Sequence, residues 1–117
     1  LHLSLRRQRQ MCIRDSPEDL MHMKRTADRL FGSDYQWSIL GAGKNQMTLA
    51  SMGAAQGANV RVGLEDSLWI EPGKLAQSSK DQVTKVRNIL EGFSLDIATP
   101  NQVRDILKLK GSRHVAF

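Results

Sequence analysis

The stretch NVRVGLEDS, residues 59–67, alternates branched apolar residues with other types and then reaches two carboxylates. Because successive side chains of a strand point to opposite faces, one face here is apolar and the other carries Arg61, Gly63 and Glu65. We expect the apolar face to pack against helices. The stretch therefore predicts a buried strand that ends at Glu65 and Asp66, where parallel-barrel enzymes place their active sites.

The residues around this strand predict helices and one further strand in alternation. Proline, serine and threonine at helix starts and glycine at helix ends mark most boundaries. Gly41-Ala42-Gly43 is expected to be a tight turn, and a loop is expected through Glu71-Pro72-Gly73. The expected elements are a helix over 17–31, a strand over 35–40, a helix over 46–56, a strand over 59–64, a helix with a capping box from Ser79 that closes at Gly92, and a helix from a cap at Thr99 to Gly111.

The order α-β-α-β-α-α determines the expected fold class. Strands that alternate with helices pair in parallel through right-handed crossovers. Two strands are too few to form a sheet buried on both faces. We therefore predict an α/β fold in which residues 17–117 are the C-terminal portion of a (β/α)8 TIM barrel, a domain of about 250 residues.

Residues 1–16 differ from the rest of the chain. They carry four of the 17 basic residues and the single cysteine of the 117-residue chain, and without them the net charge falls from +5 to +2. The run RRQRQMCIRD, residues 6–15, resembles the conceptual translation of a transposon-end sequencing adapter. We interpret residues 1–16 as an adapter-derived scar and residues 17–117 as a fragment of one domain.

The charge and the apolar content of the chain indicate which partners to expect. A small basic nucleic-acid-binding module is the alternative that the positive charge suggests, but most of that charge lies in residues 1–16. No apolar run approaches the roughly 18 residues of a membrane span, and one cysteine cannot form an internal disulfide. We expect no nucleic-acid partner, no membrane partner and a cytoplasmic location.

Gly41 and Gly43 stand at a strand-to-helix turn, where backbone amides can bind an anion. Glu65 follows 24 residues after Gly41, near the spacing of a dinucleotide fingerprint, but Gln46 stands where the third glycine belongs. The pattern leaves open an NAD(P)-dependent oxidoreductase, or contact with a phosphate-bearing substrate, with Gly41 and Gly43 as cofactor-binding residues. A plain tight turn is the alternative that the missing glycine favours.

Arg61 and Glu65 are unusual on a face that points into a barrel. Charged groups there are costly unless they are paired or bind a metal. A salt bridge that only fills the barrel and a catalytic pair both satisfy this requirement. The position of the two residues leaves both interpretations open.

Four stretches together resemble a known family. They are HMKRTADRLFG (22–32), WSILGAGKNQM (37–47), NVRVGLEDSLWI (59–70) and DIATPNQVRDILKLKG (96–111). In this order they resemble the C-terminal part of the β-keto acid cleavage enzymes, whose founding member is the 3-keto-5-aminohexanoate cleavage enzyme of lysine fermentation. The resemblance implies a zinc-dependent TIM barrel that condenses a β-keto acid with acetyl-CoA, giving acetoacetate and a new acyl-CoA.

The resemblance also implies roles for three residues. Glu65 falls at the carboxylate zinc ligand of the family, and Arg61 and Asp66 fall at the polar pair implicated in proton transfer at the keto acid. The other two ligands of the Zn²⁺ ion form a His-x-His pair, which this sequence lacks, since His22 is followed by Met23 and Lys24. We expect the full-length enzyme to be a homo-oligomer of bacterial catabolism and this fragment alone to be inactive.

Residues 1–16 are expected to be dispensable and to lack stable packing, although Ser16 precedes Pro-Glu-Asp and suits a helix N-cap. Sequencing an independent clone of the same locus tests the adapter origin. The expected upstream reading frame lacks LHLSLRRQRQMCIRD. Finding that stretch encoded there would instead restore a genuine basic arm.

Overall fold

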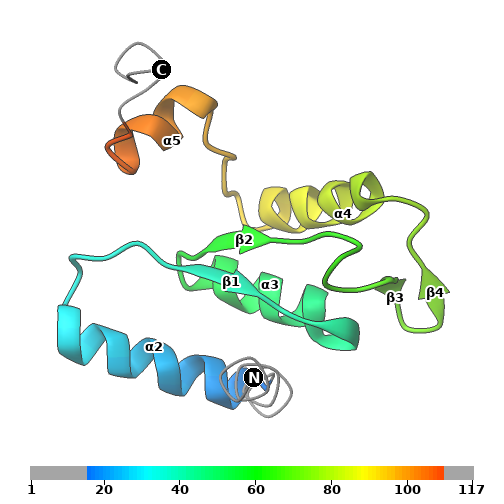
Figure 1. Cartoon of the computed structure of the whole chain (residues 1–117), viewed down its shortest axis with the longest axis horizontal. Coiled ribbons are helices and arrows are strands. Elements are labelled where there is room, and N and C mark those ends of the chain that lie inside the picture. The colour runs from blue at the N-terminus through cyan, green and yellow to red at the C-terminus, as the bar shows by residue number, and fades with distance from the viewer. Residues whose placement is uncertain (1–15, 110–117) are drawn as a thin grey trace, which may run out of the picture.

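Two short parallel strands joined through a helix form the centre of the protein (Figure 1), as seen in a computed structural model that describes residues 16–109. The fold is mixed α/β, as the sequence predicts. The helices are α2 (Pro17–Phe31), α3 (Gln46–Ala55), α4 (Ser79–Gly92) and α5 (Pro100–Ile106), with a 3-10 turn η1 (Gly43–Asn45) before α3. The strands are β1 (Ser38–Leu40), β2 (Asn59–Arg61), β3 (Trp69–Glu71) and β4 (Lys74–Leu75).

The predicted parallel pairing of the two central strands is confirmed. β1 and β2 pair in parallel, with Ser38 opposite Asn59 and Leu40 opposite Arg61. The carboxyl ends of parallel strands lie at the same edge of a sheet, so the segments that follow Leu40 and Arg61 start side by side. This edge carries the sequence-predicted site residues. Within residues 16–109 the sheet has only these two strands, and it does not close into a barrel.

Helix α3 packs against both strands and also contacts α2 and α4 (Figure 1). Its small residues allow close approach, because a side chain at Gly53 would meet Ile39 of β1. The buried cluster of Leu20, Ile39 and Leu49 joins α2, β1 and α3, and Val60 of β2 packs against it. Val60, the one residue of the expected apolar face that lies within β2, therefore does face helices.

The start of α2 follows the sequence prediction closely. Pro17 occupies the first helical position, and Ser16 accepts a hydrogen bond from the backbone amide of Asp19. The end of the helix is held against the chain that leads into β1, where the Tyr35 hydroxyl donates to the Asp28 carboxylate at 2.6 Å. Asp28 also accepts a hydrogen bond from Lys24, which lowers the pKa of Asp28.

Both predicted central strands are too long. The first begins at Ser38 rather than Tyr35, because its partner β2 begins at Asn59, which lies opposite Ser38. The second ends at Arg61 rather than Leu64, because the Gly63 carbonyl already accepts hydrogen bonds from residues 66 and 67 and turns the chain. The expected loop at residues 71–73 is in fact the tip of an antiparallel hairpin formed by β3 and β4.

Two helix boundaries also differ from the prediction. The capping box of α4 is formed by Ser78 and Asp81, one residue earlier than predicted. The capping box of α5, formed by Thr99 and Gln102, is confirmed. That helix ends at Ile106, so the predicted continuation toward Gly111 is wrong up to residue 109 and lies outside the described residues beyond it.

The expectation that residues 1–16 lack stable packing falls, for residues 1–15, outside the part of the chain that the structure describes. Within residues 16–109, every helix is too short or too polar to cross a lipid bilayer.

Substituting Gly53 by alanine tests the close packing of α3 on β1. A Cβ atom there would lie 2.9 Å from Ile39 Cβ and would also crowd Ile39 Cγ2, whereas a Cβ at Gly92 meets nothing within 4 Å. Overpacking of this kind costs about 1–3 kcal/mol. Gly53→Ala should therefore lower the free energy of unfolding measured in urea, and Gly92→Ala should not. Equal stability of the two variants would contradict the observed packing.

Candidate functional site

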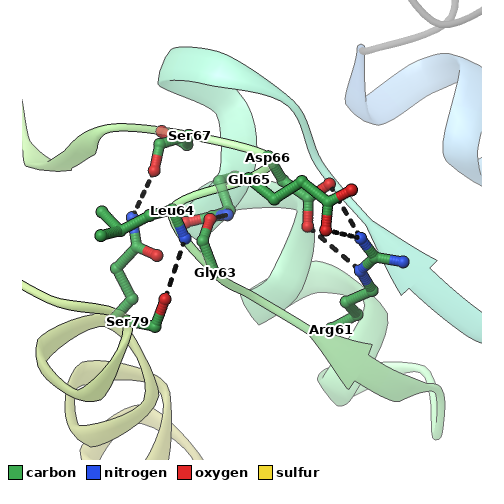
Figure 2. A network of polar contacts seen from close by, with 9 residues as sticks. Arg61, Gly63, Leu64, Glu65, Asp66, Ser67 and Ser79 are labelled. Atoms are coloured by element: carbon green, nitrogen blue, oxygen red, sulfur yellow. Dashed lines mark hydrogen bonds and ion pairs between the residues drawn. The ribbon is translucent and has the colours of Figure 1, made fainter.

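A tight turn over residues 63–67 follows β2 and carries the two carboxylates (Figure 2). The Gly63 carbonyl accepts hydrogen bonds from the backbone amides of Asp66 and Ser67, both at 3.2 Å. The turn lies at the carboxyl edge of the sheet because β2 ends at Arg61. It reverses the chain within a few residues, so Glu65 and Asp66 come back toward the end of the strand.

Arg61 contacts both carboxylates, as Figure 2 shows. Its Nη2 atom lies 3.0 Å from Oε2 of Glu65, and its Nε atom lies 3.2 Å from Oδ2 of Asp66. A weaker contact of 3.4 Å joins Nη2 to Oδ1 of Asp66. The structure therefore brings together all three residues that the sequence singles out around this strand.

The route by which these residues meet differs from the prediction. Strand alternation predicts that Arg61 and Glu65 share a face of a strand that continues through residue 64. Glu65 is instead part of the turn, and the turn places both carboxylates within reach of the same guanidinium group. Arg61 thus contacts two carboxylates that the turn brings together, and not a single partner on the same face of a strand.

The two carboxylates have different surroundings. The Asp66 side chain is 9% exposed, and both of its oxygens contact Arg61. The Glu65 side chain is 85% exposed, and within residues 16–109 only Oε2 has a partner. Asp66 is thus a shielded, oriented carboxylate, and Glu65 presents its Oε1 atom outward. An oriented carboxylate suits proton transfer, and an outward one suits a ligand role.

The cluster can supply one ligand to a metal ion. A carboxylate oxygen is a normal ligand of zinc, so the donor chemistry of Glu65 fits. Residues 16–109 contain no group of three or more histidine, cysteine, aspartate or glutamate side chains that could hold a metal ion by themselves. Any such ion would need further ligands from elsewhere.

The two glycines predicted to bind a cofactor have other roles in the structure. A Cβ atom at Gly41 would lie 2.9 Å from Cα of Gln46 and 3.0 Å from the carbonyl oxygen of Asn45, so the turn into α3 requires a residue without a side chain. Gly43 adopts a positive φ of 56°, and its amide donates to the Asp66 carbonyl at 2.9 Å. Cofactor binding at Gly41 and Gly43 stays a prediction, and the amide of Gly43 is already used.

Three further side chains hold the turn in place, and the sequence reasoning missed all of them. Gln46 donates through Nε2 to the Gly63 carbonyl at 3.1 Å, and Gln82 donates to the Ser67 carbonyl at 2.6 Å. On the α4 side, Ser79 accepts a hydrogen bond from the Leu64 amide at 3.2 Å (Figure 2). Gln46 and Gln82 are polar residues at buried helix positions, a feature that only the tertiary structure reveals, whereas Ser79 is exposed.

A cleft of about 440 Å³ lies beside the turn, between the start of α3 and the β3–β4 hairpin. Trp69 and Ile70 form part of its apolar wall, and Lys44 and Lys85 contribute positive charge. Lys85 also forms an ion pair with Glu71 at 3.3 Å. Gln46 lines the cleft and also donates a hydrogen bond to the Gly63 carbonyl, so the cleft adjoins the turn over residues 63–67, which we call the carboxylate turn.

Comparison with known proteins gives a family match and several relatives. The sequence matches the beta-keto acid cleavage enzyme family over residues 2–109. The matched range includes most of residues 1–16, whose adapter origin stays a prediction.

The relatives are bacterial enzymes whose names describe related activities. A 3,5-dioxohexanoate:acetyl-CoA acetone transferase of Paraburkholderia graminis is 69% identical over 101 residues, which are 86% of this chain and 33% of that enzyme. A 3-keto-5-aminohexanoate cleavage enzyme of Fusobacterium nucleatum is 38% identical over 74 residues, 63% of this chain and 27% of the enzyme. A 3-dehydrocarnitine:acetyl-CoA trimethylamine transferase of Rhizobium meliloti is 36% identical over 77 residues, 66% of this chain and 25% of the enzyme. The chain thus spans a third or less of each of these relatives.

Replacing Arg61 tests whether its contact with the shielded Asp66 carboxylate stabilises the protein more than an exposed ion pair does. Arg61→Gln leaves the nearly buried Asp66 carboxylate without its cation, a loss worth about 1–3 kcal/mol. Arg87→Gln is the matched control, because Arg87 and Glu91 form an exposed pair on α4 with the same 3.0 Å separation, and such pairs contribute about 0–1 kcal/mol. Denaturant unfolding should show the larger destabilisation for Arg61→Gln. An equal effect would mean that the Arg61 cluster is an ordinary surface pair.

Proposed function

The chain belongs to the β-keto acid cleavage enzyme family, and we propose that the full-length protein cleaves a β-keto acid with acetyl-CoA, giving acetoacetate and a new acyl-CoA. The observation that carries the proposal is the Arg61 cluster, which gathers a shielded and an outward carboxylate at the carboxyl edge of a parallel sheet. The family's TIM barrel would complete this sheet, with residues 17–117 as its C-terminal portion. A cytoplasmic location and a homo-oligomeric state stay predictions of the sequence.

The first substrate to test is 3,5-dioxohexanoate. The relative that carries this name is 69% identical over 101 residues, whereas the relatives named for 3-keto-5-aminohexanoate and 3-dehydrocarnitine are 38% and 36% identical. All three names describe a keto group, and two of them name acetyl-CoA. Residues outside this chain also shape the pocket, so a panel of β-keto acids is needed alongside the first choice.

The cluster gives each residue a chemical task in this reaction. Asp66 would take and return the proton that the keto acid releases and accepts, because its carboxylate is oriented and shielded. The Arg61 guanidinium would hold the Asp66 carboxylate in place near the substrate, because it donates hydrogen bonds to both carboxylate oxygens. Arg61 and Asp66 are the proposed catalytic residues.

Glu65 is the proposed ligand of a zinc ion. Its carboxylate is exposed and pairs with Arg61 through Oε2, and its Oε1 atom has no partner within residues 16–109. The remaining ligands would come from a His-x-His pair, which this sequence does not contain. A zinc ion bound there would polarise the keto oxygen as a Lewis acid. Because only one ligand is present, the segment alone should be inactive.

The cleft beside the turn provides room for part of the second substrate. Its volume of about 440 Å³, its apolar wall around Trp69 and the positive charge of Lys44 suit a thioester chain linked to phosphates. This placement would also account for the sequence-based expectation of a phosphate-bearing substrate near Gly41 and Gly43. The alternative NAD(P)-dependent oxidoreductase gains no comparable support, because the Gly43 amide already binds the Asp66 carbonyl.

The proposed activity is tested by incubating the full-length protein with 3,5-dioxohexanoate and acetyl-CoA and measuring both products. Acetoacetate and a new acyl-CoA should form in equal amounts, and neither should form without acetyl-CoA. Absence of both products with every β-keto acid of a panel would contradict the proposal.

Two variants separate the proposed roles of the carboxylates. Glu65→Gln keeps the size of the side chain but removes its charge, so the full-length protein should lose tight zinc binding and most turnover. Asp66→Asn should keep the metal and slow the chemical step by about 10²–10⁴-fold. Metal analysis and rate measurements on both variants decide the matter. Stoichiometric zinc and near-normal turnover in Glu65→Gln would show that Arg61 and Glu65 form only a structural salt bridge.

A further inference from the structure

Two glutamines from different helices are buried beneath the carboxylate turn. The Gln46 residue at the start of α3 is 1% exposed, and Gln82 on α4 is fully buried. Each donates its amide hydrogen to backbone carbonyls of the segment 63–69, Gln46 to Gly63 and Gln82 to Ser67 and Trp69. Their bonds therefore flank Glu65 and Asp66 on both sides.

Both glutamines lower the stability of the fold relative to apolar residues of similar size. The side-chain oxygen of each is buried and has no hydrogen-bond partner within residues 16–109. A buried acceptor without a partner destabilises a protein, and an apolar side chain of similar volume avoids that penalty. Departures of this kind from the best local choice are expected where function requires a fixed geometry.

Within residues 16–109 the turn makes few other hydrogen bonds to the rest of the protein, so the two glutamine amides are its main buried side-chain contacts. The Asp66 carbonyl is held by the Gly43 amide, and the Leu64 amide by Ser79. Without Gln82, the Ser67 carbonyl, next to Asp66, loses its bond to the scaffold. Without Gln46, the Gly63 carbonyl keeps only the two local bonds that close the turn.

We infer that Gln46 and Gln82 are positioning residues, which fix the turn so that Glu65 and Asp66 face the reacting atoms, and this inference rests on the function proposed above. Neither glutamine touches Glu65 or Asp66 side chains; each acts through the backbone that carries them. Misplacement of a reacting group by about 1 Å can cost about 10²-fold in rate. Loosening the turn should therefore affect the rate of the chemical step more than the binding of substrates.

Methionine substitutions test the inference in the full-length protein. Gln82→Met and Gln46→Met keep the approximate volume and remove the amide donor together with its unpartnered oxygen. Each should lower kcat by about 10–100-fold, with KM for the β-keto acid changed less than about threefold and a melting temperature close to that of the parent. Gln102→Met is the matched control, because it removes the capping glutamine of α5 without touching the turn, and it should keep the parent kcat.

Amide hydrogen exchange supplies a readout that does not depend on activity. Residues 63–69 should exchange faster in Gln82→Met and Gln46→Met than in the parent, and Gln102→Met should leave them unchanged. Parental kcat together with parental exchange in both methionine variants would overturn the inference. If the parent itself lacks acyl transfer, the proposed function fails, and unchanged exchange would then be the result that overturns the positioning role.

Discussion

The Gly63 carbonyl accepts three hydrogen bonds, and the arrangement of the site depends on them. Two come from the amides of Asp66 and Ser67 and close the turn, and the third comes from Gln46 at the start of α3. The first two bonds end β2 at Arg61 and bring the carboxylates back toward its guanidinium group. The third ties the turn to the helix that packs on both central strands. The Gly63 carbonyl oxygen therefore takes part both in the local turn and in the contact between the turn and α3.

The elements whose boundaries are encoded locally could be predicted from the sequence. Ser16 and Pro17 begin α2, and Thr99 and Gln102 cap α5, because each cap needs only residues within one turn of a helix. The parallel order of the central strands also followed from the alternation of element types. The predicted N-cap of α4 was one residue too late, because two serines are adjacent there. Ser78 forms the cap, and Ser79 accepts a hydrogen bond from the Leu64 amide.

The parts of the site that depend on long-range contacts could not be predicted. Arg61, Glu65 and Asp66 were identified, but alternation suggested a strand where the Gly63 carbonyl makes a turn. Gln46 and Gln82 contact segments 17 and 15 residues away, so nothing in their own neighbourhood reveals their partners. For Gly41 the sequence leaves anion binding and a plain tight turn open, and only the structure reveals that a side chain there would collide with the backbone at the start of the next helix.

We propose that the Arg61 cluster holds a metal-binding carboxylate, Glu65, and a proton-transferring carboxylate, Asp66, at one edge of the sheet. The most direct measurement is a crystal structure of the full-length protein grown with zinc, with anomalous data collected at the zinc edge. The account predicts an anomalous peak about 2.0–2.2 Å from a Glu65 carboxylate oxygen, with Asp66 still bound to Arg61. A zinc ion bound elsewhere, with Glu65 paired only to Arg61, would contradict it.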